Sequence, residues 1–188
     1  VYSITKTLLE NGNRQIALFT GNPAFSSESD CIRGYEDAFR HFNLPLDSAL
    51  VYETNMSKED AFKVSMSNLC GQPADAIVAT SENIAFGVLE TLHVLGQKVP
   101  EDVQLITLSE ESWNSSTKYP GMLHTSRTAF TLGKKAAELL EENIKNPALF
   151  EKKTCLLTDQ VPKIAAVPPV HTASAQTGSS VSYTHLRA

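Results

Sequence analysis

The clearest pattern of hydrophobic and polar positions covers residues 75–108. An apolar run of strand type at 75–79 precedes a stretch whose apolar residues recur at helical spacing and predict one buried stripe. That stripe consists of Ile84, Val88, Leu89, Leu92 and Leu95. Gly96 can adopt the left-handed conformation that ends a helix, and a second apolar run follows at 103–108. This order predicts a βαβ unit with parallel strands and a right-handed crossover.

The same alternation of strands and helices continues on both sides of this unit. Further strands are predicted at 14–20, 49–53, 121–125 and 153–158. Further helices are predicted at 1–11, 31–42, 58–69 and 131–145, with Ser57 as the N-cap of the third. Because strands alternate with helices, we expect the α/β class, with a parallel, doubly wound sheet covered by helices on both faces.

The two ends of the sequence differ from its middle. From residue 165 onward serine, threonine, alanine, proline and histidine dominate and no apolar period survives, so residues 165–188 are interpreted as a disordered or non-native tail. The first predicted helix begins abruptly, without a cap or a methionine. We therefore expect the chain to be part of a longer protein.

Composition narrows the class of protein. The chain has 188 residues, of which 41% are hydrophobic and 20% charged, which is enough for one domain with a core or for one lobe and part of another. A net charge of −5 disfavours nucleic-acid binding by this segment itself. No run has the length of a membrane span or the form of a signal peptide. Together with three widely spaced cysteines, expected to be free thiols, this predicts a cytoplasmic location.

Sequence signatures of catalysis are absent. The chain contains no glycine-rich phosphate loop, nucleophile elbow, zinc-protease motif or CxxC pair. The histidines lack ligand spacing and are interpreted as surface or helix-end residues, so we expect no metal and no cofactor. Glu110 and Glu111 are interpreted as a solvated acidic loop, and Cys31, near a predicted helix start, as a small packed residue. We expect no enzyme.

The candidate ligand site follows from the predicted sheet. In open α/β sheets, ligands bind outside the carboxyl ends of the strands. The polar, serine-rich segment 21–30 is expected to be a loop at that edge, and three further loops are expected beside it, at 54–57, 80–83 and 109–114.

Several phrases resemble the effector-binding core of LacI/GalR-type transcription regulators, which have a periplasmic-binding-protein-like fold. They are RGYEDAFRHFNLP at 33–45, DAIVATSENIAFGVLETLHVLGQKVPEDV at 75–103 and YPGMLHTSRTAFTLGKKAAELL at 119–140. The resemblance runs in unbroken order over about residues 1–161. It implies that a helix-turn-helix headpiece and most of a first lobe precede this chain in the whole protein.

The resemblance also implies a division of the chain into parts. Residues 13–120 would form the C-terminal effector-binding lobe, and 151–164 a strand that returns to it. Residues 1–12 and 121–150 would supply a helix and a crossover helix of the incomplete N-terminal lobe. Both helices would then lack their sheet, so their apolar stripes are expected to be partly exposed.

The family's effector positions can be transferred one at a time. Cys31 occupies the place of an arginine three residues before Gly34, and Met56 that of a stacking aromatic residue. Ser81 and Glu82 replace an Asn-Asp pair. The family's Asp-Asp pair corresponds to Ser109 and Glu110. With Ser26 from the serine cluster, these replacements offer hydrogen bonds to a polyol in place of the bidentate arginine.

The function implied by the resemblance is ligand sensing. A sugar-like effector bound between two lobes would favour one lobe arrangement, and a homodimer would pass this bias to headpieces on operator DNA, with no membrane involved. Two other classes remain open: a periplasmic sugar-binding protein of an ABC uptake system, and an enzyme on a doubly wound sheet. A further open alternative is a degenerate effector site that responds to a partner protein or to nothing.

Overall fold

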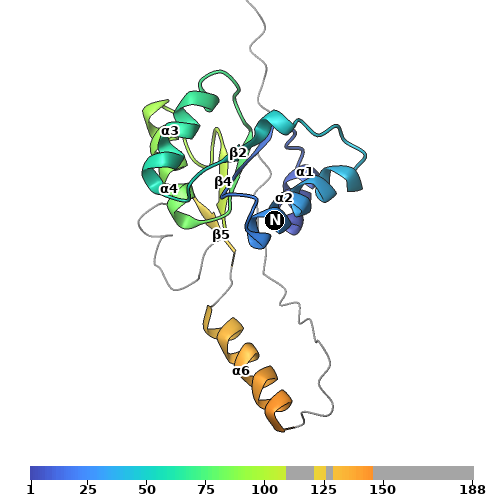
Figure 1. Ribbon diagram of the computed structural model, residues 1–188. Helices are drawn as coiled ribbons and strands as arrows, with labels where there is room; N and C mark the ends of the chain where they lie inside the picture. The colour runs from blue at the N-terminus through green and yellow to red at the C-terminus, as the bar shows by residue number, and fades with distance from the viewer. Residues whose placement is uncertain (109–120, 126–128, 146–188) are drawn as a thin grey trace, which may run out of the picture.

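A five-stranded parallel sheet covered by helices on both faces forms the centre of the protein (Figure 1). The computed structural model describes residues 1–108, 121–125 and 129–145. The strands, in the spatial order β2-β1-β3-β4-β5, are β1 (Ile16–Thr20), β2 (Val51–Glu53), β3 (Ala76–Ala79), β4 (Gln104–Thr107) and β5 (Leu123–His124). The helices are α1 (Tyr2–Glu10), α2 (Ser26–His41), α3 (Lys58–Leu69), α4 (Glu82–Val94), α6 (Ala129–Lys145) and the 3-10 turn η1 (Ser48–Leu50).

All neighbouring strands are parallel, which confirms the predicted α/β class and its doubly wound sheet. The expected strand at 153–158 and the tail at 165–188 lie outside the described residues. Gly96 ends α4 with a φ of 71°, and the Ser57 hydroxyl caps α3, both as predicted. Within the described ranges, none of the helices combines the length and the apolar composition that a membrane span requires.

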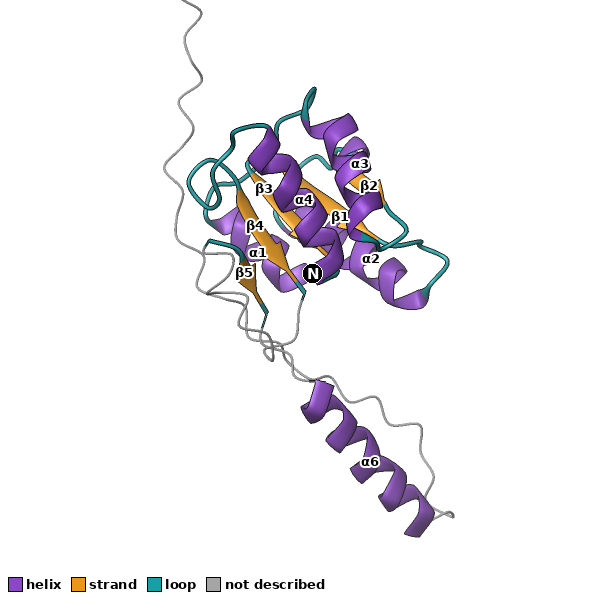
Figure 2. Cartoon of the chain, turned by 90° about the vertical axis from the view of Figure 1, so that its left-hand side faces the viewer, coloured by secondary structure: helices purple, strands orange, loops and turns teal. Residues whose placement is uncertain are grey.

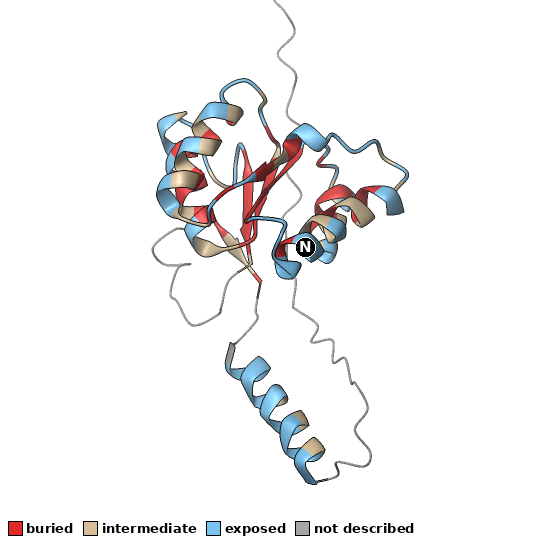
Figure 3. Cartoon of the chain, viewed as in Figure 1, coloured by how far each residue is buried: buried red, intermediate tan, exposed pale blue. Residues whose placement is uncertain are grey.

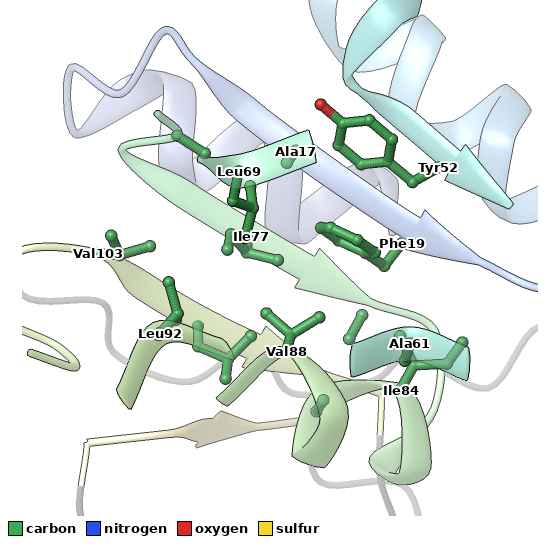
Figure 4. Close-up of a cluster of buried hydrophobic side chains, with 14 of the residues drawn as sticks. Ala17, Phe19, Tyr52, Ala61, Leu69, Ile77, Ile84, Val88, Leu92 and Val103 are labelled. Atoms are coloured by element: carbon green, nitrogen blue, oxygen red, sulfur yellow. The ribbon is translucent and has the colours of Figure 1, made fainter. Parts of the chain in front are cut away.

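Alternate residues of each strand pack into opposite layers. In β1, Ala17 and Phe19 face the layer of α3 and α4, while Ile16 and Leu18 face the layer of α1 and α2. All positions of β1 are buried, as expected for a strand covered on both faces. Figure 4 shows Phe19 in the first of these layers, in the same cluster as Val88 of α4.

α3 and α4 lie side by side over the strands (Figure 2). Gly87 of α4 makes this contact possible, because a Cβ atom at that position would lie 2.3 Å from the backbone oxygen of Lys58 and 2.8 Å from the Cβ of Ala61. The backbones of α3 and α4 are therefore in direct contact at Gly87. Ile84, Val88 and Leu92 of the predicted stripe on α4 are buried against the sheet.

The apolar stripe of α1 is buried, in contrast to the partial exposure that was expected of it. Ile4, Leu8 and Leu9 of α1 are buried in one cluster with strand residues and with Tyr35 of α2. Gly34 allows the close approach of α1 and α2, because a Cβ there would lie 3.1 Å from the backbone nitrogen of Tyr2. The apolar stripe of α1 thus completes one face of this sheet and is not exposed.

The apolar stripe of α6 is exposed, as expected. Phe130 is 80% exposed, Leu140 61% and Ile144 69%. Figure 3 shows this exposure along the length of the helix, in contrast to the buried strands. A helix with one apolar face is normally stabilised by packing that face against another element, so α6 is the least supported helix of the described chain.

Replacing Gly87 by alanine is expected to lower the free energy of unfolding by about 1–3 kcal/mol, the usual range for overpacking. The added methyl group would overlap the backbone oxygen of Lys58, and the gain in helix propensity of about 1 kcal/mol offsets only part of this. Urea unfolding measures the difference. Gly71→Ala is the matched control, since a Cβ there meets nothing within 4 Å. Equal unfolding midpoints for the two variants would contradict the close helix contact.

Candidate functional site

The carboxyl ends of the parallel strands meet at one edge of the sheet. The strand pairings align one residue of each strand just before this edge: Tyr52, Phe19, Ala79, Thr107 and His124. Helices α2, α3 and α4 begin beyond it, after the short loops 21–25, 54–57 and 80–81. This edge is the one at which the sequence predicted the ligand-facing loops.

A buried carboxylate joins two strand ends to a helix at this edge. The Oε2 atom of Glu28 accepts hydrogen bonds from Thr20 Oγ1 at 2.8 Å, from the Gly21 backbone nitrogen at 2.9 Å and from Thr80 Oγ1 at 2.8 Å. Thr20 ends β1, Thr80 follows β3, and Glu28 belongs to the first turn of α2, where it is 6% exposed. One side chain thus fixes the relative position of these three segments.

Hydrogen bonding keeps this carboxylate charged. Burial raises the pKa of Glu28. The hydrogen bonds from Gly21, Thr80, Thr20 and Ser27 together lower it by more than burial raises it, so the net pKa lies below the ordinary glutamate value. Glu28 is therefore ionised at neutral pH. Its negative charge also lies in the first turn of α2, where the helix dipole favours it.

The expected loop at 21–30 is wrong in its second half, because α2 begins at Ser26 and not at Cys31. The serines and acids that indicated a loop form the first turns of a helix, and Glu28 is held there by its strand-end partners. Ser26 remains at the edge, as the first residue of α2. Cys31 is half-buried more than one turn further along, so it does not have the helix-start position expected of it.

Met56 lies directly over the end of β1. A Cβ atom on Gly21 would be 2.8 Å from both Cγ and Sδ of Met56 and 3.2 Å from Cγ of Glu28, so the absence of a side chain on Gly21 admits both neighbours. Met56 has a φ of 65°, and its backbone nitrogen donates a hydrogen bond to Thr54 Oγ1. The residue at the predicted stacking position therefore lies beside Glu28.

Ser81 and Glu82 begin α4 and differ in role. The Ser81 hydroxyl accepts a hydrogen bond from the Ile84 backbone nitrogen at 3.4 Å and caps the helix. The Oε1 atom of Glu82 lies 4.0 Å from Nδ1 of His124 at the end of β5. Among the described residues, this buried oxygen has no hydrogen-bond partner, and neither does the Oγ1 atom of Thr107, the residue paired with His124.

His124 is not the surface histidine that the sequence was taken to indicate. Its side chain is 17% exposed. Burial lowers the pKa of His124, the nearby Glu82 carboxylate raises it in part, and the net pKa lies below the ordinary value. His124 is therefore mainly neutral at pH 7 and offers no positive charge to the nearby Glu82 carboxylate.

The structure thus brings Ser26, Met56, Ser81 and Glu82 to one edge. Ser109 and Glu110 lie outside the described residues. Sequence reasoning missed Glu28, His124 and the two threonines that bind Glu28. Only the position of Thr20 at the end of one predicted strand, and of Thr80 directly after another, pointed to the edge. Within the described ranges no group of three histidine, cysteine or acidic residues is arranged to hold a metal ion.

Comparison with known proteins agrees with this arrangement. A family model described as a periplasmic binding protein-like domain matches residues 5–162. The chain is similar to the transcriptional repressor PurR of Actinobacillus pleuropneumoniae, with 30% identity over 77% of this chain and 43% of that protein. It is 25% identical to the ribose operon repressor of Haemophilus influenzae, over 85% of this chain and 50% of that protein.

The solved structure of the transcription regulator CcpA of Lactococcus lactis has a similar fold. It aligns with a TM-score of 0.74 and 26% identity, over 89% of this chain and 60% of that one. The chain spans about half the length of the two repressors that it matches. All three relatives are transcription regulators by name.

Replacing Glu28 by glutamine is expected to lower the free energy of unfolding at pH 7 by about 2 kcal/mol, the order of hydrogen bonds to a charged group. The pKa of Glu28 is lower in the folded state than in the unfolded chain, where it is about 4.3. The contribution of the Glu28 carboxylate to the stability of the folded protein is therefore complete above the unfolded pKa and is lost as the pH falls through the folded pKa. The difference between wild type and variant should therefore shrink below about pH 4.

Urea unfolding at a series of pH values measures this difference. Glu36→Gln, on the same helix, removes an equal charge and is expected to change little, because Glu36 is only partly buried. A Glu28→Gln difference that does not depend on pH would contradict the role of the carboxylate.

Proposed function

The chain belongs to the periplasmic binding protein-like domain family. We propose that it is the effector-sensing and dimerisation core of a LacI-type DNA-binding regulator. The observation that carries the proposal is the match of the family model to residues 5–162, together with the similarity of the chain to relatives that are named as repressors. The strand-end edge supports it, because open α/β sheets bind ligands there.

In this proposal a small polyhydroxy effector contacts the strand-end loops. The contacting residues would be Ser26, Cys31, Met56, Ser81, Glu82, Ser109 and Glu110. The rest of the protein would supply the opposite lobe and the headpiece that binds operator DNA. An effector that binds one lobe arrangement more tightly shifts the population toward it, and a homodimer passes the shift to the headpieces.

The alternatives have less support. The named relatives are repressors, which favours a cytoplasmic regulator over a periplasmic component of an uptake system. Cys70 is a free thiol in the described part of the chain, as expected in a reducing compartment. Effector sensing makes and breaks no covalent bond, so the proposal assigns no enzymatic activity and no cofactor.

The complete product of the gene is expected to bind a defined DNA sequence. Selection from a random DNA pool identifies this sequence, and fluorescence anisotropy then measures the affinity with and without sugars. At least one sugar should change the DNA affinity by about 5–150-fold, the usual range of allosteric coupling. An export signal upstream of the chain, or DNA binding without sequence preference, would contradict the proposal.

Replacing Met56 by alanine is expected to weaken the effect of the most active sugar, because the side chain that covers Gly21 at the strand-end edge is lost. The sugar concentration that gives half of the maximal change in DNA affinity should rise severalfold. Met66→Ala is the matched control, since Met66 lies on α3 about two turns further from the edge. If both variants respond like the wild type, Met56 does not contact the effector.

A further inference from the structure

The strand order of the sheet defines its topological switch point. The chain passes from β1 to β2 on one side of β1 and then to β3 on the other side, so the switch point lies between β1 and β3. In doubly wound sheets with this strand order, ligands bind at the carboxyl end of the switch point. Here the Glu28 carboxylate is bound at that place, between Thr20 at the end of β1 and Thr80 after β3.

Three hydrogen-bond donors converge on one oxygen atom of this carboxylate. The hydroxyls of Thr20 and Thr80 and the backbone nitrogen of Gly21 all lie within 2.9 Å of Glu28 Oε2. Thr20 is 1% exposed and Thr80 9%. The Oε1 atom has a longer contact, with Ser27 Oγ at 3.5 Å. Buried donors aimed at one point are suited to an ionised oxygen, because hydrogen bonds to a charged acceptor are the strong ones.

Bonds that do not involve Glu28 hold the donors in place. The Thr80 backbone nitrogen donates to the Phe19 backbone oxygen at 3.0 Å, and the Thr54 backbone nitrogen donates to the Thr20 backbone oxygen at 2.8 Å. The positions of the two threonines are therefore fixed by the sheet and its neighbouring loop. We expect the three donors to keep their arrangement when the Glu28 side chain is removed.

The space for the carboxylate comes from a residue without a side chain. A Cβ atom on Gly21 would lie 3.2 Å from Cγ of Glu28, so Gly21 supplies both a donor and room beside it. Replacing Glu28 by alanine removes its Cγ atom and its carboxylate group. The atoms removed correspond to an acetate ion, which is therefore the free ligand that matches the vacated space.

We propose that Thr20, Gly21 and Thr80 form a binding site for a small carboxylate and that the chain occupies this site with its own Glu28 as an internal ligand. The site is closed to external ligands in the native protein, because a tethered group competes at a high effective concentration. A ligand of the strand-end edge then has to bind outside these three donors. The inference goes beyond the proposed function, since it holds for any ligand of this edge.

The test uses the complete gene product and acetate as the probe. Glu28→Ala is unfolded by heat at pH 7 in increasing sodium acetate, with sodium chloride added to keep the ionic strength constant. Its unfolding temperature should rise by about 2 °C or more for each tenfold increase in acetate above the dissociation constant, because acetate binds only the folded state. The wild type should not respond, because Glu28 fills the site.

Two further variants serve as controls. Glu36→Ala removes the same atoms from a partly buried position on the same helix and should show no specific response to acetate. Combining Glu28→Ala with Thr80→Val removes one of the three donors while keeping a side chain of similar size, and should abolish most of the response.

If Glu28→Ala does not fold in chloride, the same titration measures the fraction that refolds from urea, which should rise with acetate alone. No specific acetate effect on Glu28→Ala, or an equal effect on the wild type or Glu36→Ala, overturns the inference. A response that persists in the double variant overturns the assignment of the site to these donors. None of these results changes the measurements of DNA affinity that test the proposed function.

Discussion

Coverage of the sheet by helices on both faces is the constraint on which the rest of the structure depends. β1, β3 and β4 are buried along their whole length, and an unpartnered polar group there would lose its hydration without replacement. Polar groups are therefore concentrated where the strands end. The Glu28 carboxylate uses this position to join β1, β3 and α2, and the same ends provide the surface at which a ligand is expected.

The sequence predicted those parts of the fold that depend on periodic burial. The βαβ unit at 75–108 was correct, because its strands and helix each bury a regular apolar pattern. The start of α2 was wrong, because first-turn serines and acids have the composition of a loop. The roles of Glu28 and His124 were missed for a related reason, since their partners are distant in sequence and no local pattern reports such contacts.

α1 and α6 show why an amphipathic pattern alone does not identify the partner of a helix. Both have one apolar face, and both were assigned to the same incomplete lobe. α1 is buried on this sheet because Gly34 lets its backbone approach α2, while the apolar face of α6 is exposed. The periodicity of a sequence indicates which face of a helix is buried but not which surface covers it, and for α1 the absence of a side chain on Gly34 contributes to the close contact with α2.

The missing side chain at Gly87 has a mechanical consequence for the strand-end edge. Where two helix backbones touch, neither can slide or rotate past the other without atomic overlap. The loops at 54–57 and 80–81 are attached to the starts of α3 and α4, so a stiff block carries both. A displacement of one loop is then transmitted to the other, so the two loops are coupled through the contact between α3 and α4 and do not move independently.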